Sequence, residues 1–189
     1  SITGYGQTGP FFEKAGHDIN YLALSGLASY GGGERGKPNL AAMQIADIAG
    51  GSHHAVIGIL AAYQHRFNQR QIQADGGQAV VLGQHIDISM ADCAFALNVM
   101  YGASSLYSGE NPKPQGEMLN GGLSTYEYYE TKDNKFLSVG ALEPQFAKVF
   151  FDTIGHPEWL MRAADMNQKE LVRDVQNIIK QKTLSEWES

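Results

Sequence analysis

The residue types best suited to chemistry in this chain are a histidine and an aspartate that each stand near glycines. His17 follows Gly16, and Asp47 comes shortly before Gly50 and Gly51. An imidazole and a carboxylate can both transfer protons, so a pair that faces the two sides of one carbon acid can act as base and conjugate acid in turn. The two residues therefore predict a proton-transfer site if the fold brings them together.

Each of these two residues also has a purely structural interpretation. A histidine flanked by glycine is by default a loop residue whose ring satisfies nearby backbone groups. Asp47 falls in the first turn of a predicted helix, where unpaired amides and the helix dipole favour an anionic side chain. Without further information the residue type and position favour this capping role for Asp47.

Five motifs occur in an order that resembles the family III CoA-transferases, the CaiB/BaiF superfamily. They are residues 4–10, residues 16–21, Asp47 ahead of its two glycines, the pair Gly121 and Gly122, and residues 139–146. Within that superfamily the chain is most similar to the α-methylacyl-CoA racemase branch, because the transferases generally lack the histidine of the second motif. The similarity extends from the first residue to about Phe150 and weakens beyond it.

The resemblance implies an enzyme that epimerises 2-methylacyl-CoA through an enolate by 1,1-proton transfer. In that mechanism His17 acts on one face of C2 and Asp47 acts on the other. Glu143 is expected to support His17 by a hydrogen bond that fixes the tautomer of the ring, and to come from the partner chain of an interlocked homodimer. The backbone amides that enter the Asp47 helix are candidate donors to the enolate oxygen.

The resemblance also assigns residues to the CoA thioester. Asp18 and Tyr21 are expected to help hold CoA, while Gly121 and Gly122 match a mobile glycine loop near the thioester. Met43 lies where the family usually has more polar sequence, and we expect it to enlarge the apolar share of the pocket. A branched hydrophobic acyl group is consistent with this composition. No cofactor is expected beyond the CoA that the substrate carries.

Two alternatives to racemisation stay open at this point. In CoA transfer between carboxylic acids, Asp47 would be a nucleophile that passes through aspartyl anhydride and thioester states. His17 and Glu143 would then have no required role. The other alternative is a non-catalytic module that binds CoA or mediates oligomerisation.

Composition excludes several other classes of protein. The 189 residues are 43% hydrophobic and 18% charged, with a formal net charge of -6, which argues against a nucleic-acid or anionic-membrane partner. No apolar run approaches the roughly 20 residues of a membrane span, and Cys93, the one cysteine, excludes an internal disulfide. Adjacent His53 and His54 point to different sides of a helix, so no metal site is expected. We expect a cytoplasmic protein whose partners are an acyl-CoA and a second copy of itself.

The two ends of the sequence suggest a fragment. The chain begins at Ser1 rather than at a methionine, and it stops at Ser189 soon after a threonine and a serine of the type that caps helices. The resemblance implies an N-terminal portion that helps bind the adenine nucleotide and a C-terminal portion that returns to the large domain. We therefore expect the fragment to lack part of the CoA site.

The elements that must position these residues divide into two parts. We expect a large-domain portion at residues 1–110, a small α/β domain at residues 111–189 and a linker at residues 108–115. The expected fold class is α/β, with part of a Rossmann-like large domain followed by the small domain. Hydrophobic periodicity and turn residues predict the large-domain elements: a strand end at residues 2–3, a helix at 18–27, a loop at 31–38, a largely buried helix at 45–66, short strands at 71–74 and 78–82, a strand at 85–88 and a helix at 90–105.

The small domain shows clear local signals. Residues 125–131 and 135–139 alternate in polarity and are rich in β-formers, so they predict a hairpin with its turn at 132–134. Pro144 is typical of the first position of a helix, which places Glu143 at the helix entrance. Residues 167–182 carry an apolar face and predict a final amphipathic helix.

Overall fold

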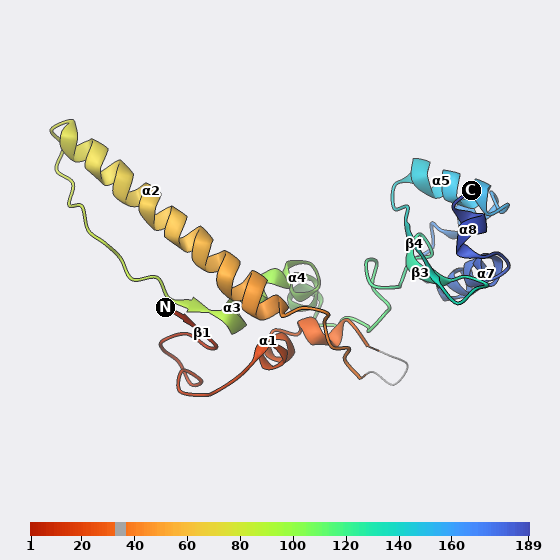
Figure 1. Ribbon diagram of the computed structural model, residues 1–189, viewed down its shortest axis with the longest axis horizontal. Coiled ribbons are helices and arrows are strands. Elements are labelled where there is room, and N and C mark those ends of the chain that lie inside the picture. Colours follow the sequence, from red (N-terminus) through yellow and green to blue (C-terminus); the bar gives the residue numbers. More distant parts are fainter. Residues whose placement is uncertain (33–36) are drawn as a thin grey trace. The chain divides into compact units, whose positions relative to one another are not determined.

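The computed structural model describes residues 1–32 and 37–189, which divide into two compact units (Figure 1). The first unit contains Ser1–Ser29 and Gly33–Asn111, and the second contains Tyr30–Gly32 and Pro112–Ser189. Each unit combines a two-stranded sheet with helices, so the chain has the expected α/β class. The loop predicted at 31–38 includes residues 33–36, which lie outside the described residues.

The first unit is built around a short parallel pair of strands and several helices. In chain order its elements are β1 (Ile2–Thr3), α1 (Asp18–Leu24), the 3-10 helix η1 (Leu27–Ser29), the π-helix η2 (Ala46–His53), α2 (His54–Ala74), β2 (Ile88–Ser89), α3 (Met90–Leu97) and α4 (Val99–Ser108). Ile2 pairs with Ile88, so the strand predicted at 85–88 is present but begins only at its last residue.

The core of the first unit joins α1, η2 and α3. Its buried residues include Tyr21, Ala46 and Ala94. The backbone of η2 approaches α3 closely, because a Cβ on Gly50 would lie 3.2 Å from the carbonyl oxygen of Met90. Glycine therefore permits this contact between the helix that carries Asp47 and the helix behind it.

The predicted strand at residues 71–74 is wrong, because α2 continues through these residues to Ala74. The end of α2 is defined by Gly76, whose φ of 82° is left-handed, and by a hydrogen bond of 2.8 Å from Gly77 N to Ile72 O. This is the usual glycine termination of an α-helix. Residues 78–82 form no strand either, so the glutamine-rich run extends the helix instead of starting a hairpin.

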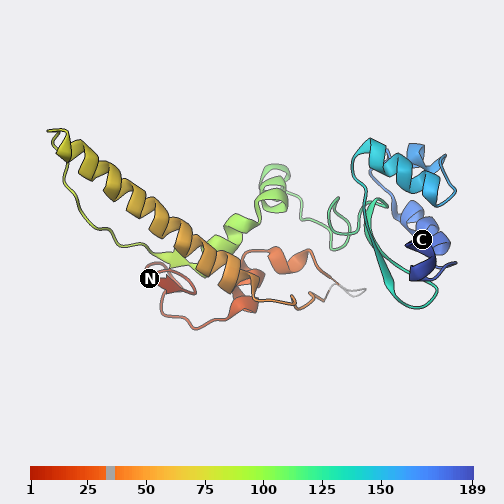
Figure 2. The same ribbon diagram turned by 45° about the horizontal axis from the view of Figure 1, so that its top comes forward.

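The prediction that this helix is largely buried is also wrong. Ile57 and Leu60 are each 61% exposed. A Cβ on Gly58 would lie 3.0 Å from Ile86, and Figures 1 and 2 show the segment after α2 returning along one side of the helix. Among the described residues of the first unit, the remaining apolar side chains of α2 have little cover.

The single helix predicted at 90–105 is instead two helices that meet at Asn98. The ψ of Asn98 is 36°, its side-chain oxygen accepts a hydrogen bond of 3.0 Å from Gly102 N, and its Nδ2 donates one of 2.9 Å to Ser25 O. Asn98 thus caps α4 and at the same time fastens it to the end of α1. Hydrophobic periodicity carries no information about this polar break.

The second unit packs helices on one face of an antiparallel hairpin (Figure 2). Its elements are β3 (Tyr126–Glu130), β4 (Phe136–Gly140), α5 (Pro144–Thr153), α6 (Trp159–Arg162), α7 (Lys169–Ile179) and α8 (Leu184–Trp187). The predicted hairpin is confirmed, with Glu130 opposite Phe136. The predicted amphipathic helix is confirmed as α7, whose residues Leu171, Val175 and Ile179 are buried.

None of the helices in the described part of the chain is long and apolar enough to cross a membrane.

Candidate functional site

His17 stands at the point where the chain enters α1. Its backbone is extended, with φ of -133° and ψ of 172°. Its amide donates a hydrogen bond of 3.0 Å to the side-chain oxygen of Asn20, and its carbonyl accepts one of 2.8 Å from Asn20 N. These bonds fix the backbone at His17, while the residue itself is exposed. Because His17 is exposed, a molecule from solvent can reach it.

Asp47 lies in the first turn of η2 and is half-buried. η2 has π-helical hydrogen bonding, a form that is rare in proteins and frequent at functional sites. The ring of His54 makes a hydrogen bond of 2.7 Å to Ala49 O, and Ser52 Oγ donates one of 3.2 Å to Asp47 O. These side-chain contacts, each spanning five residues, secure the wider turn that presents Asp47.

Asp18 connects the two elements that carry His17 and Asp47. Its Oδ1 accepts hydrogen bonds from Ala46 N at 2.6 Å and from Asp47 N at 3.2 Å. The next amide, of Ile48, donates to Gln44 O at 3.0 Å. The expectation that these amides bind an enolate oxygen is therefore wrong in this structure, because a carboxylate of the chain already occupies the entrance of the helix.

The structure brings His17 and Asp47 to one cavity of about 370 Å³. It lies in the first unit, and its lining residues are His17, Asp18, Ile19, Leu40, Ala41, Gln44 and Asp47. The cavity thus combines an imidazole, carboxylates and an amide with apolar side chains, as small-molecule sites do. No group of three or more His, Cys, Asp or Glu side chains within residues 1–32 and 37–189 could hold a metal ion.

Four lining residues were not predicted as site residues: Ile19, Leu40, Ala41 and Gln44. The apolar helical pattern that contains Ile19 predicts a place in the core. Ile19 is instead 58% exposed, although the aspartate before it is buried. Gln44 precedes Asp47 by three residues, a spacing that places two helical side chains on one face and could have identified it. Met43 is half exposed and does not line the cavity, so its expected contribution to the pocket is not seen.

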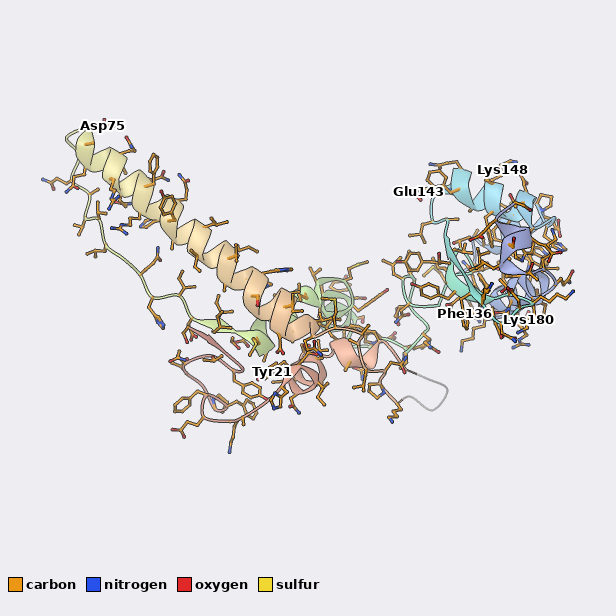
Figure 3. The ribbon with its side chains drawn as sticks, viewed as in Figure 1. Tyr21, Asp75, Phe136, Glu143, Lys148 and Lys180 are labelled. Atoms are coloured by element: carbon orange, nitrogen blue, oxygen red, sulfur yellow. The ribbon has the colours of Figure 1, made fainter. Side chains whose placement is uncertain are left out.

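Tyr21 supports the segment that precedes His17 (Figure 3). It is 3% exposed, its hydroxyl donates a hydrogen bond of 2.6 Å to Gly16 O, and its ring meets that of Tyr5 edge-on at 5.2 Å. Burial raises the pKa of Tyr21, and the nearby Tyr5 and Asp47 raise it further. Its hydroxyl is thus neutral and already bonded, and its contact with CoA stays a prediction.

Glu143 lies in the second unit, directly before the first residue of α5 (Figure 3). Its carbonyl accepts hydrogen bonds of 2.9 Å from Phe146 N and Ala147 N, which begin the helix. The side chain is exposed and does not cap α5. The predicted position at a helix entrance, with Pro144 as the first helical residue, is confirmed, and its contact with His17 stays a prediction.

Gly121 and Gly122 belong to a turn of the second unit that leaves no room for side chains. Gly121 has a left-handed φ of 105°, and a Cβ on it would lie 2.7 Å from the carboxylate of Glu127. A Cβ on Gly122 would lie 2.6 Å from Glu117 O. Gly121 also lines a cavity of about 500 Å³ over the hairpin, while the role of both glycines near a thioester stays a prediction.

Comparison with known proteins identifies relatives along the whole chain. A family model described as CoA-transferase family III matches residues 1–189. The chain is 33% identical to an alpha-methylacyl-CoA racemase of Homo sapiens, over 98% of this chain and 46% of that protein. It is 32% identical to a succinate-glutarate CoA-transferase of Agrobacterium fabrum, over 79% of this chain and 34% of that protein.

Comparison with solved structures identifies proteins of the same family. The crystal structure of a CaiB/BaiF family protein from Brucella suis aligns with a TM-score of 0.67 at 25% identity, over 99% of this chain and 49% of that chain. The chain spans about half the length of the curated relatives that it matches.

Proposed function

Because the chain belongs to CoA-transferase family III, we propose that it is part of an enzyme that epimerises a 2-methylacyl-CoA by 1,1-proton transfer. The α-hydrogen leaves C2 as a proton and its electron pair moves into the thioester carbonyl, which gives an enolate. A proton then returns to the opposite face of C2 and the configuration is inverted. No redox partner is needed, and the substrate's own CoA is the only coenzyme in the proposal.

The observation that carries the proposal is the shared cavity of His17 and Asp47. Racemisation by two residues requires one proton-transfer group on each side of C2, and both groups must reach the same small volume. The proposal is supported by the exposed position of His17 and the half-buried position of Asp47 on one cavity of the first unit. Ile19 and Leu40 supply apolar surface on which a branched acyl group can pack.

The remaining predicted residues complete the proposal. We propose that the enzyme is an interlocked homodimer and that Glu143 of one copy bonds to His17 of the other, where it would fix the tautomer of the ring. The exposed, uncommitted position of its side chain at the start of α5 supports this role. Gly121 and Gly122 are proposed to allow the backbone to approach the thioester.

CoA transfer between carboxylic acids is the second candidate. It is favoured by the succinate-glutarate CoA-transferase among the relatives and by the access of the Asp47 carboxylate to the cavity. In this reaction the Asp47 carboxylate attacks the thioester carbonyl and the CoA thiolate leaves, which gives a mixed anhydride. The thiolate then attacks the aspartyl carbonyl of the anhydride, so that the first acid leaves and an aspartyl-CoA thioester forms. The second acid attacks this thioester to give a new anhydride and free thiolate, and attack of the thiolate on its acyl carbonyl yields the new acyl-CoA and restores Asp47. His17 has no necessary part in it, so we rank it below racemisation.

The experiment that separates the two reactions uses the intact protein and one enantiomer of a 2-methylacyl-CoA in D2O. Racemisation predicts deuterium at C2 together with the opposite configuration, as measured by mass spectrometry and chiral chromatography. Transfer of CoA to an added carboxylic acid, with no deuterium at C2, would reject racemisation in favour of the second candidate. Binding of CoA with neither reaction would leave a non-catalytic module.

A further inference from the structure

The N-terminus of η2 is capped by a residue of another helix. Ile45 precedes the helix, and its apolar side chain makes no capping hydrogen bond. The cap is provided by Asp18, the first residue of α1, whose Oδ1 lies 2.6 Å from Ala46 N and 3.2 Å from Asp47 N. Normal capping residues belong to their own helix. Here a helix depends for its first turn on a carboxylate from another helix.

The carboxylate is well suited to a fixed structural bond. Asp18 is 7% exposed, so its hydrogen bonds are shielded from competition by water. Hydrogen bonds to an ionised acceptor are about twice as strong as neutral ones, and the negative charge also matches the positive end of the helix dipole. The two bonds therefore hold α1 and η2 in one relative position.

The two hydrogen bonds from Ala46 N and Asp47 N to Asp18 form a clamp that lies next to both proposed proton-transfer groups. His17 is the residue directly before Asp18, and Asp47 is one of the two residues whose amide Asp18 accepts. One proton-transfer group is thus adjacent to Asp18 in sequence, and the other is bonded to it through its amide. His17, Asp18 and Asp47 all line the same cavity. The clamp ties the backbone next to His17 to the backbone that carries Asp47.

We propose that Asp18 is a positioning residue that sets the separation of His17 and Asp47 across the cavity, an inference that rests on the proposed function. It differs from the contact with CoA that family resemblance implies for Asp18. A CoA contact would make substrate affinity depend on Asp18. A positioning role makes the rate of proton transfer depend on it, because a misplacement of about 1 Å can cost on the order of 10²-fold in rate.

Three variants of the intact protein separate these roles. Asp18→Ala removes the acceptor and the charge, whereas Asp18→Asn removes the charge and keeps a side-chain oxygen that can accept from both amides. Asp75→Ala is the matched control, because Asp75 is exposed at the far end of α2 in the same unit (Figure 3). The kcat and KM of deuterium incorporation at C2 are measured for each variant.

We expect Asp18→Ala to lower kcat by about 10²-fold with KM within about 3-fold. Asp18→Asn should recover kcat to within about 10-fold of the unmodified protein, since the acceptor is restored. Asp75→Ala should match the unmodified protein. A rise in KM with an unchanged kcat in Asp18→Ala would overturn the proposal in favour of a CoA contact, and an Asp18→Asn variant that folds but is as slow as Asp18→Ala would overturn it as well.

Hydrogen exchange at the amides of Ala46 and Asp47 tests the clamp apart from activity. Both amides should be protected in the unmodified protein and in Asp18→Asn, and both should exchange faster in Asp18→Ala. If Asp18→Ala does not fold, the activity and protection of Asp18→Asn still decide the matter. Absence of C2 exchange in the unmodified protein would overturn the proposed function, whereas unprotected amides in a folded and active protein would overturn the clamp.

Discussion

Replacing Phe151 by alanine should strongly destabilise the second unit. Phe151 lies on α5, is fully buried, and belongs to the core that joins this helix to Tyr129 of the hairpin and Val175 of α7. The same helix begins directly after Glu143, so the packing of Phe151 also fixes the element that presents Glu143. Loss of this ring therefore tests how the proposed supporting residue is held.

The magnitude follows from the burial of the side chain. Phe151 has an exposed fraction of 0%, and truncation of such a phenylalanine to alanine costs about 3–5 kcal/mol in free energy of unfolding. Phe146 lies on the same helix with an exposed fraction of 52%. Its change to alanine should stay within about 1 kcal/mol, because it leaves little cavity and alanine favours the helix.

Intrinsic fluorescence in urea provides a selective assay. The chain has two tryptophans, Trp159 and Trp187, and both belong to the second unit, so emission excited selectively from tryptophan reports that unit alone. We expect the Phe151→Ala midpoint to fall well below that of Phe146→Ala. Equal destabilisation by the two variants, or a loss of less than about 1 kcal/mol for Phe151→Ala, would refute the packing described for α5.

Three further predictions address other parts of the chain. Tyr21→Phe removes a buried hydroxyl donor, so it should lower the free energy of unfolding of the first unit by about 1 kcal/mol; faster hydrogen exchange in α1 would show this, and unchanged exchange would contradict it. Hydrogen bonds, foremost from a threonine hydroxyl, hold the pKa of Asp133 below its ordinary value. The stability that Asp133 contributes is thus present above its unfolded pKa and is lost as pH falls below about 4. Asp133→Asn should flatten the tryptophan-monitored decline in this range, whereas the exposed control Asp165→Asn should not, and equal profiles would count against the assignment. Burial, followed by the charge of Asp92, raises the pKa of Cys93, so iodoacetamide at pH 8 should modify this thiol more slowly than free cysteine by mass spectrometry; an equal or faster rate would contradict it.

Local sequence determined the second unit well. The hairpin, the start of α5 and the buried face of α7 each depend on a short run of residues, such as the proline after Glu143 or the spacing of Leu171 and Val175. The physical causes, turn propensity, fixed φ and helical periodicity, act within that run. Such features can be predicted without knowledge of the rest of the fold.

The structure of the first unit depends on contacts between residues that are far apart in the sequence. Asn98 ends α3 because its side chain reaches both Gly102 N and Ser25 O. α2 continues to Ala74 because its polar residues tolerate solvent and a glycine termination follows only there. Hydrophobic pattern alone describes neither a polar group shared between two helices nor the amount of cover that a helix receives.

The candidate site also has features that residue types and motifs indicate and features that depend on contacts between distant residues. Residue type made His17 and Asp47 candidates for proton transfer, and only the family resemblance favoured this role over a structural one; both roles stay predictions. Sequence could not show that Asp18 would occupy the amides of Ala46 and Asp47, because these contacts join residues that are 28 and 29 positions apart. Nor could it place Leu40 at the cavity, since no periodic element contains that residue.

The central claim is that His17 and Asp47 transfer protons on opposite faces of one carbon. The most direct test is deuterium exchange at C2 for each enantiomer separately, in D2O, with His17→Ala and Asp47→Ala of the intact protein. The account predicts that each variant loses inversion and still exchanges only the enantiomer whose C2 hydrogen faces the remaining group, so that the two variants exchange opposite enantiomers. Exchange of the same enantiomer by both variants, or undiminished inversion in either of them, would contradict it.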